Sequence, residues 1–236
     1  MAPATSSPLG LAARATLGAL LQPALLAVFL LYPPGTLAWR AAWVLVAVSF
    51  VAASASMLAL ARTQRALLIE RLRPPLQRGQ PGADKILVLS FAAAFFGAIR
   101  FVPYDVFMLH WLPPPGPVAA GLGLALVSAG WGLVAAAMHA NAFAVPAVKA
   151  QRERGQRVVD RGPYAVVRHP MYAGAAALLV GTPLWLGSTA GVLVALVPIA
   201  LLALRIALEE RFLRRELPGY EAYAARVRAR LVPGVW

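Results

Sequence analysis

The sequence predicts an all-α integral membrane protein with about six transmembrane helices. Of its 236 residues, 60% are apolar and only 13% are charged, and the mean hydropathy is +0.69. Soluble domains contain roughly 45–50% apolar and about 25% charged residues. The apolar residues also gather in stretches of about the length that crosses roughly 30 Å of hydrocarbon. Together these observations exclude an ordinary soluble domain.

Each apolar stretch favours a helix. The stretches are rich in Ala, Leu, Val and Gly, whereas the strands of a membrane barrel would alternate apolar and polar residues. A helix also satisfies its own backbone hydrogen bonds within the bilayer. The predicted spans are residues 17–31, 41–61, 86–102, 118–138, 171–187 and 189–208.

The chain reads as a single membrane domain over residues 1–236. We expect a four-helix part at 1–138 and a region that carries the functional motifs at 139–236. The connection at 62–85 contains Pro-Pro and Pro-Gly pairs after a short helical stretch, so it predicts an interfacial helix followed by a loop.

Positive charge lies almost entirely on one side of the predicted spans. All but two of the 22 Lys and Arg residues precede the first span, lie in the 62–85 and 139–170 connections, or follow residue 204. The exceptions are Arg40 and Arg100. The positive-inside rule therefore predicts an inner or plasma membrane protein whose termini and active site are cytoplasmic. With this placement, a net charge of +13 matches the lipid bilayer's anionic head groups and argues against a nucleic-acid partner.

Several other chemistries are disfavoured. The absence of cysteine excludes a disulfide framework, a thiolate metal site and a cysteine nucleophile. Only His139 and His169 could serve as imidazole ligands on the basic side, so we expect no metal. No serine lies near His169, which argues against a Ser-His-Asp hydrolase.

Some polar and aromatic residues have structural interpretations. Arg100 and Asp105, near the end of the third span, predict an ion pair or a snorkelling arginine. Tyr164, Tyr220 and Tyr223 are interpreted as interfacial aromatics that anchor the loop and the tail. Glycines in the fourth span favour close helix packing.

Two segments carry the residues that suit chemistry, namely 139–174 and the tail from residue 205. A helix over 171–187 rises about 25 Å at ~1.5 Å per residue, and the next helix descends a similar distance. The adjacent carboxylates at 209 and 210 therefore return to the membrane face on which the 139–174 segment ends.

This return brings Glu209 and Glu210 toward Arg168, His169 and Tyr172. An arginine can fork onto a carboxylate while a glutamate holds an ammonium group. The set thus suits a charged small molecule, and a zwitterionic amino-acid moiety would satisfy both ends at once.

The order of residues in these segments is distinctive. Gly-Pro-Tyr-x-x-Val-Arg-His-Pro-x-Tyr-x-Gly at 162–174 is followed by Arg-Ile-x-x-Glu-Glu-x-x-Leu at 205–213 and by Tyr-x-x-Tyr-x-x-x-Val at 220–227. In these motifs the sequence resembles the isoprenylcysteine carboxyl methyltransferase family and, more loosely, the phospholipid N-methyltransferases. Both are integral membrane enzymes that use S-adenosylmethionine. The resemblance covers roughly the C-terminal 100 residues.

The resemblance implies a pocket for S-adenosylmethionine formed by the loop, the last helical hairpin and the tail. It implies that Arg168 orients the acceptor carboxylate and that Arg168 and Glu210 are the catalytic residues. The implied cofactor-binding residues are Asn141, His169, Pro170, Tyr172, Gly174, Glu209 and Glu210.

The favoured activity is O-methylation of the carboxylate of an isoprenylcysteine-like or other lipophilic acceptor. Such a carboxylate is ionised at neutral pH and needs no general base. Three alanines at 175–177 replace the aromatic run of eukaryotic family members. The acceptor therefore stays open, with phospholipid or amine N-methylation and small-thiol S-methylation as alternatives. The non-enzymatic alternatives are a membrane scaffold and a transporter.

Overall fold

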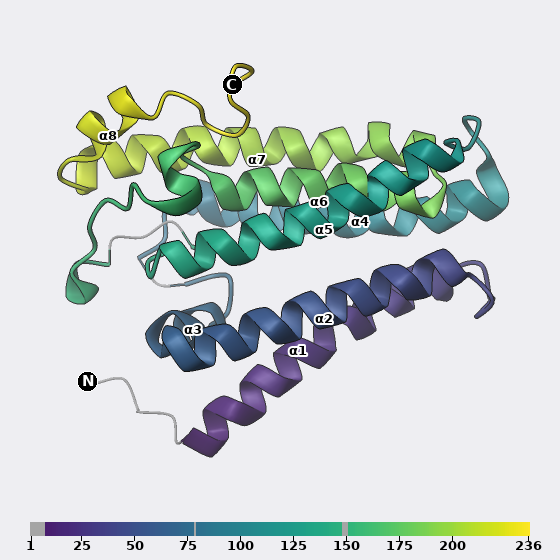
Figure 1. Ribbon diagram of the computed structural model, residues 1–236, viewed down its shortest axis with the longest axis horizontal. Helices are drawn as coiled ribbons and strands as arrows, with labels where there is room; N and C mark the ends of the chain where they lie inside the picture. The colour runs from purple at the N-terminus through teal and green to yellow at the C-terminus, as the bar shows by residue number, and fades with distance from the viewer. Residues whose placement is uncertain (1–7, 78, 148–150) are drawn as a thin grey trace.

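The protein is built from helices that lie roughly along one axis (Figure 1). The structure is a computed structural model and describes residues 8–77, 79–147 and 151–236; no strand occurs in this part of the chain. The long helices are α1 (Pro8–Leu31), α2 (Arg40–Thr63), α4 (Gly82–Tyr104), α5 (Pro117–Ala140), α6 (Pro170–Leu186) and α7 (Thr189–Glu216). The short helices are α3 (Arg65–Arg71) and α8 (Tyr220–Arg226), with a π-helical turn η1 (Asp105–Leu109) and 3-10 turns η2 (Arg152–Arg154) and η3 (Gly162–Ala165).

Five of the described helices are long and apolar enough to cross a membrane, namely α1, α2, α4 continued by η1, α5 and α7. The remaining predicted span, at 171–187, corresponds to α6, whose 17 residues extend about 25 Å at ~1.5 Å per residue. The prediction of an all-α membrane protein is therefore confirmed. Helix α7 continues to residue 216, beyond the predicted span end at 208, because the Glu, Arg and Leu residues that follow favour helix.

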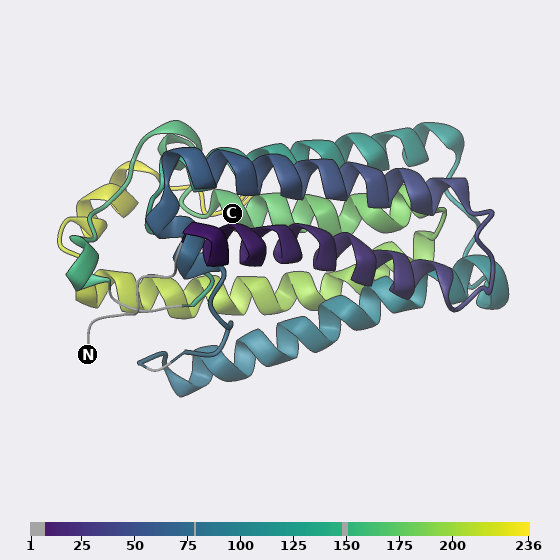
Figure 2. The same ribbon diagram turned by 90° about the horizontal axis from the view of Figure 1, so that it is seen from below.

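The segments that carry the predicted site gather at one end of the molecule, which we call the site end. α3, α8 and the loop before α6 lie toward this end, at the left of Figure 1. Figure 2 shows the turns between α1 and α2 and between α4 and α5 at the opposite end. α3 begins the 62–85 connection, as the sequence predicts.

Glycines allow α5 and α6 to pack with their backbones in close contact. A Cβ atom on Gly130 would lie 2.7 Å from the carbonyl oxygen of Gly174, and one on Gly181 would lie 2.6 Å from that of Gly123. Real Cβ atoms do not approach other heavy atoms so closely. The predicted close packing of the fourth span is thus confirmed at Gly123, and it fixes where α6 starts relative to the end of α5.

At the end opposite the site, the buried carboxylate of Asp105 links η1 to the turn between α6 and α7. Its Oδ2 atom accepts a hydrogen bond from Ser188 Oγ at 2.5 Å, and its Oδ1 atom accepts one from Trp111 N at 3.0 Å. Arg100 instead donates to the Tyr104 hydroxyl at 3.1 Å and places its guanidinium over the Tyr32 and Tyr104 rings. The ion-pair interpretation of Arg100 and Asp105 is therefore wrong, because Asp105 serves the turn between α6 and α7.

We expect Gly130→Ala to lower the thermal midpoint of the detergent-solubilised protein, because overpacking a helix contact costs about 1–3 kcal/mol. Gly132→Ala is the matched control, since nothing lies within 4 Å of a Cβ at this position. Alanine also favours helix over glycine, so the control should melt at or above the wild-type temperature. Equal melting of the two variants would show that the α5–α6 contact is not close-packed.

Candidate functional site

The loop before α6 is held against the C-terminal tail by backbone hydrogen bonds. Arg168 N donates to Ala229 O at 2.9 Å, and His169 N donates to Arg230 O at 3.0 Å. Proline at position 170 begins α6, where its missing N–H costs nothing. The loop and the tail therefore behave as one unit at the site end.

A buried carboxylate, that of Glu210 on α7, joins this unit to the last long helix. Glu210 Oε1 accepts a hydrogen bond from Arg168 Nε at 2.7 Å and lies 3.2 Å from His169 Nε2, and Glu210 Oε2 accepts from Arg230 Nε at 3.1 Å. The side chains of Arg168 and Glu210 are each only 5% exposed. Arg168 Nη1 also donates to the carbonyl oxygens of Val227 and Arg228, both at 2.7 Å. One ion cluster thus connects α7, the loop and the tail.

The neighbouring carboxylate, that of Glu209, belongs to a different network. Its Oε2 atom accepts a hydrogen bond from the Tyr172 hydroxyl at 2.6 Å. The Tyr172 ring lies beneath the guanidinium of Arg205, and Arg205 Nε donates to Asp84 Oδ1 at 2.9 Å. Gln80 Nε2 donates to the other Asp84 oxygen at 2.5 Å. This second network therefore ties the position of Glu209 to the beginning of α4.

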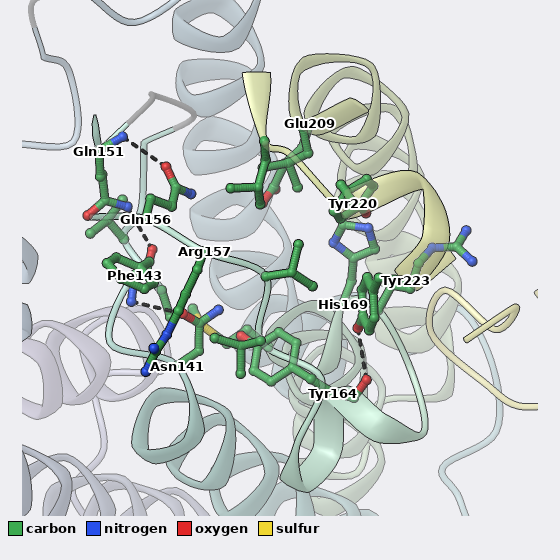
Figure 3. Close-up of a pocket in the computed structure, with 18 of the residues that line it drawn as sticks. Asn141, Phe143, Gln151, Gln156, Arg157, Tyr164, His169, Glu209, Tyr220 and Tyr223 are labelled. Atoms are coloured by element: carbon green, nitrogen blue, oxygen red, sulfur yellow. Dashed lines mark hydrogen bonds between the residues drawn. The ribbon is translucent and has the colours of Figure 1, made fainter. Parts of the chain in front are cut away.

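These segments enclose a cleft of about 110 Å³ at the site end. Figure 3 shows Gln151, Gln156 and Phe143 on one side of it and His169, Tyr220 and Tyr223 on the other. The wall combines polar side chains with aromatic and aliphatic ones. Its members are Asn141, Phe143, Ala144, Val145, Ala147, Gln151, Gln156, Arg157, Val158, Val159, Tyr164, Arg168, His169, Met171, Tyr172, Glu209, Phe212, Leu213, Leu217, Tyr220 and Tyr223.

Five of the site residues expected from the sequence meet on this wall, namely Asn141, Arg168, His169, Tyr172 and Glu209. The side chain of Asn141 caps its own turn, because its Oδ1 atom accepts a hydrogen bond from Phe143 N at 2.8 Å.

The other three expected residues lie behind the wall. Glu210 is enclosed by its ion partners, Pro170 is the first residue of α6, and Gly174 packs against Gly130 of α5. Their contacts in the structure are with other parts of the chain. Whether any of the three also contacts a ligand stays a prediction.

The segment 151–159 forms a side of the cleft; it lies within the 139–174 segment singled out from the sequence, but none of its residues is among the expected site residues. Gln151 is almost fully buried; its side-chain nitrogen donates to Phe143 O at 2.9 Å, and its backbone N–H donates to Gln156 Oε1 at 2.8 Å. These contacts fold the segment back over the end of α5. The only signal in the sequence is a Gly-Gln-Arg-Val-Val run between two basic stretches, which does not specify a pocket wall.

The three tyrosines interpreted as interfacial anchors are buried inside the site end instead. Tyr164, Tyr220 and Tyr223 are each at most 9% exposed. Burial raises the pKa of Tyr164 to about 12 and also raises the pKa of Tyr220 and Tyr223. All three therefore carry neutral hydroxyl groups at physiological pH. The anchoring interpretation is wrong, because the tail folds over the loop and encloses these rings.

The composition of the wall limits what the cleft can bind. Glu209 offers a carboxylate to a cation, and the rings offer flat apolar surface. The amide side chains add polar surface, although the carbonyl oxygens of Asn141, Gln151 and Gln156 already accept hydrogen bonds within the protein. Among the described residues, no group of three or more acidic or histidine side chains is arranged to hold a metal ion. Because Arg157 and Arg168 line the cleft together with Glu209, the cleft is suited to a small organic molecule with charged, polar and aromatic parts.

Residues 118–218 match the phospholipid methyltransferase family. The match begins in α5 and ends just after α7, so it contains every site residue expected from the sequence. It covers less than half of the chain and belongs to the same group of membrane methyltransferases as the resemblance described above. A search of curated proteins gave no match. The comparison supports a membrane methyltransferase and does not distinguish among acceptors.

We expect Arg168→Ala to destabilise the protein strongly, because removing one member of a buried ion pair costs about 3–5 kcal/mol. For a chain of this size the thermal midpoint should fall by roughly 10 °C. The control is Arg214→Ala, which removes an exposed pair with Glu221 and should change stability by less than about 1 kcal/mol. If the two variants melt together, the Glu210 cluster does not hold the site end.

Proposed function

We propose that this protein transfers the methyl group of S-adenosylmethionine to a lipophilic acceptor at the membrane surface, most specifically to a carboxylate of isoprenylcysteine type. The observation that carries the proposal is the position of Glu209, a carboxylate on the wall of a partly aromatic cleft at the membrane edge. The family match across this region supports the same chemistry.

The residues of the cleft fit the cofactor. S-adenosylmethionine presents an ammonium and a sulfonium group, a ribose and an adenine ring, and it supplies an electrophilic methyl group when bound. Glu209 would hold the cationic end, and its partner Tyr172 keeps that carboxylate in place. Phe143 and Tyr164 offer ring surface, and Gln151 and Gln156 offer amides near it. His169 and Asn141 complete the wall as further polar contacts.

Acceptor activation needs little from the protein if the acceptor is a carboxylate. An ionised carboxylate is already a nucleophile, so the chain must chiefly hold it in line and exclude water. Charge is neutralised as the carboxylate reacts with the cation, and a dry site favours that change. Arg168 also lines the cleft, and it is the proposed contact to the acceptor in addition to its hydrogen bond with Glu210.

A second cavity supports a lipophilic acceptor. It has a volume of about 280 Å³ and lies among the middle parts of α1, α2, α4, α5 and α6. Its lining is mostly Leu, Ile, Val and Phe, with Gln22, Ser49 and Thr182 as polar exceptions. A space of this kind at membrane depth suits a hydrocarbon chain. The charge distribution in the connections supports a cytoplasmic site, with the acceptor's polar end at the inner surface.

Glu209→Gln should weaken binding of S-adenosylmethionine by about tenfold or more, because a hydrogen bond to a charged group contributes about 1.5–3 kcal/mol. The amide can still accept the bond from Tyr172, so the fold should be preserved. Calorimetry on the detergent-solubilised protein measures the affinity. Glu221→Gln is the control, since this exposed carboxylate lies outside the cleft. Equal affinities for wild type and Glu209→Gln would refute the assignment of Glu209.

Phospholipid N-methylation is the second candidate, because the family that residues 118–218 match is described as phospholipid methyltransferases. Transfer of a labelled methyl group into isolated membranes distinguishes the two candidate activities. A methyl ester releases labelled methanol in alkali, whereas an N-methylated head group retains the label. We expect the alkali-labile product, because the two side chains on the cleft wall that could deprotonate an amine are already engaged: His169 lies 3.2 Å from Glu210, and Glu209 accepts a hydrogen bond from Tyr172. Label retained in the phospholipid head groups would establish the second candidate instead.

A further inference from the structure

The tail contributes to the cleft a hydroxyl group that has no hydrogen-bond partner among the residues the structure describes. Tyr220, the first residue of α8, is 4% exposed and lines the cleft. Among the described residues, its hydroxyl oxygen is one of two buried side-chain polar atoms without a hydrogen-bond partner. The other is Gln64 Oε1, just before α3, and Gln64 is not among the residues that line the cleft. Buried polar groups in proteins are usually paired, so an unpaired one in a binding cleft needs an explanation.

Tyr223 provides an internal comparison. It lies one helical turn further along α8, and its ring centroid is 5.7 Å from that of Tyr220. The Tyr223 hydroxyl donates to the carbonyl oxygen of Tyr164 at 2.8 Å, so this tyrosine fastens the tail to the loop. The two buried tyrosines of α8 thus differ in how their hydroxyl groups are bonded. The Tyr223 hydroxyl is bonded to the loop, whereas the Tyr220 hydroxyl has no partner in the part of the chain that the structure describes.

The surroundings of the Tyr220 hydroxyl decide what it can bind. The carboxylates of Glu209 and Glu210 and the burial of the ring all disfavour its ionisation, so the pKa of Tyr220 is raised. The group therefore keeps its proton and acts as a donor. Glu209, on the same wall, can only accept hydrogen bonds while ionised. The wall thus presents a donor and an acceptor together, which suits a ligand that carries an oxygen acceptor near a cationic or hydroxyl donor.

We propose that the Tyr220 hydroxyl donates a hydrogen bond to an oxygen atom of bound S-adenosylmethionine. The inference rests on the proposed function and adds a binding residue from the tail, outside the region 118–218 that matches the family. Two oxygens of this ligand have the required chemistry: the carboxylate of the amino-acid end and a ribose hydroxyl. The ligand 5′-methylthioadenosine separates them, because it has the ribose and lacks the amino-acid carboxylate.

The test compares wild type, Tyr220→Phe and Tyr223→Phe as full-length detergent-solubilised proteins. Thermal unfolding is measured without ligand, and calorimetry measures the affinity for S-adenosylmethionine and 5′-methylthioadenosine. Tyr220→Phe should melt at or above the wild-type temperature, because it removes an unpaired buried hydroxyl. It should bind S-adenosylmethionine about two- to tenfold more weakly. Tyr223→Phe should show a midpoint lowered by roughly 2–4 °C, because it loses a bond within the protein.

Each outcome has one meaning. A loss of affinity for both ligands supports the proposal with a ribose oxygen as the partner, and a loss for S-adenosylmethionine alone supports it with the carboxylate. Unchanged affinity of Tyr220→Phe for both ligands, or a lowered midpoint without ligand, overturns it. If wild type does not bind S-adenosylmethionine at millimolar concentration, the proposed function itself is wrong.

Discussion

The site end depends on the buried carboxylate of Glu210. A carboxylate removed from water is strongly unfavourable unless charged or polar partners surround it. Here the partners are Arg168, His169 and Arg230, which come from the loop before α6 and from the tail. None of these segments can provide the cluster alone. Burial of Glu210 therefore requires that α7, the loop and the tail meet in one arrangement.

This arrangement also explains why the adjacent carboxylates of Glu209 and Glu210 have different surroundings. Consecutive side chains on an α-helix point about 100° apart, as ~3.6 residues per turn requires. Once Glu210 faces its ion partners, Glu209 is turned toward Tyr172 and the cleft. One glutamate thereby holds the site end together, and the other faces the cleft. The position of Glu209 is also linked to α4, through the contact of Tyr172 with Arg205 and the hydrogen bond from Arg205 to Asp84. Helix α4 lies outside the region of the family match.

The helices and the meeting of the two motifs were predictable because they follow from chain length and apolar composition. A rise and a return through the bilayer bring position 209 back to the level of position 172, whatever the details of packing. Which glutamate faces the cleft was not predictable, since side-chain direction depends on the packing of α7 against the loop. The burial of Tyr220 and Tyr223 was also missed, because it requires the tail to fold over the loop. The wall at Gln151 and Gln156 depends on contacts with the end of α5 that no local pattern records.

The most direct test of the account is an experimentally determined structure of the protein with S-adenosylhomocysteine, the product that remains after methyl transfer. We expect ligand density in the cleft, with the amino-acid or ribose part against Glu209 and the adenine near the rings of Phe143 and Tyr164. Density for the ligand in the apolar cavity among α1, α2, α4, α5 and α6, or elsewhere on the surface with the cleft empty, would contradict it.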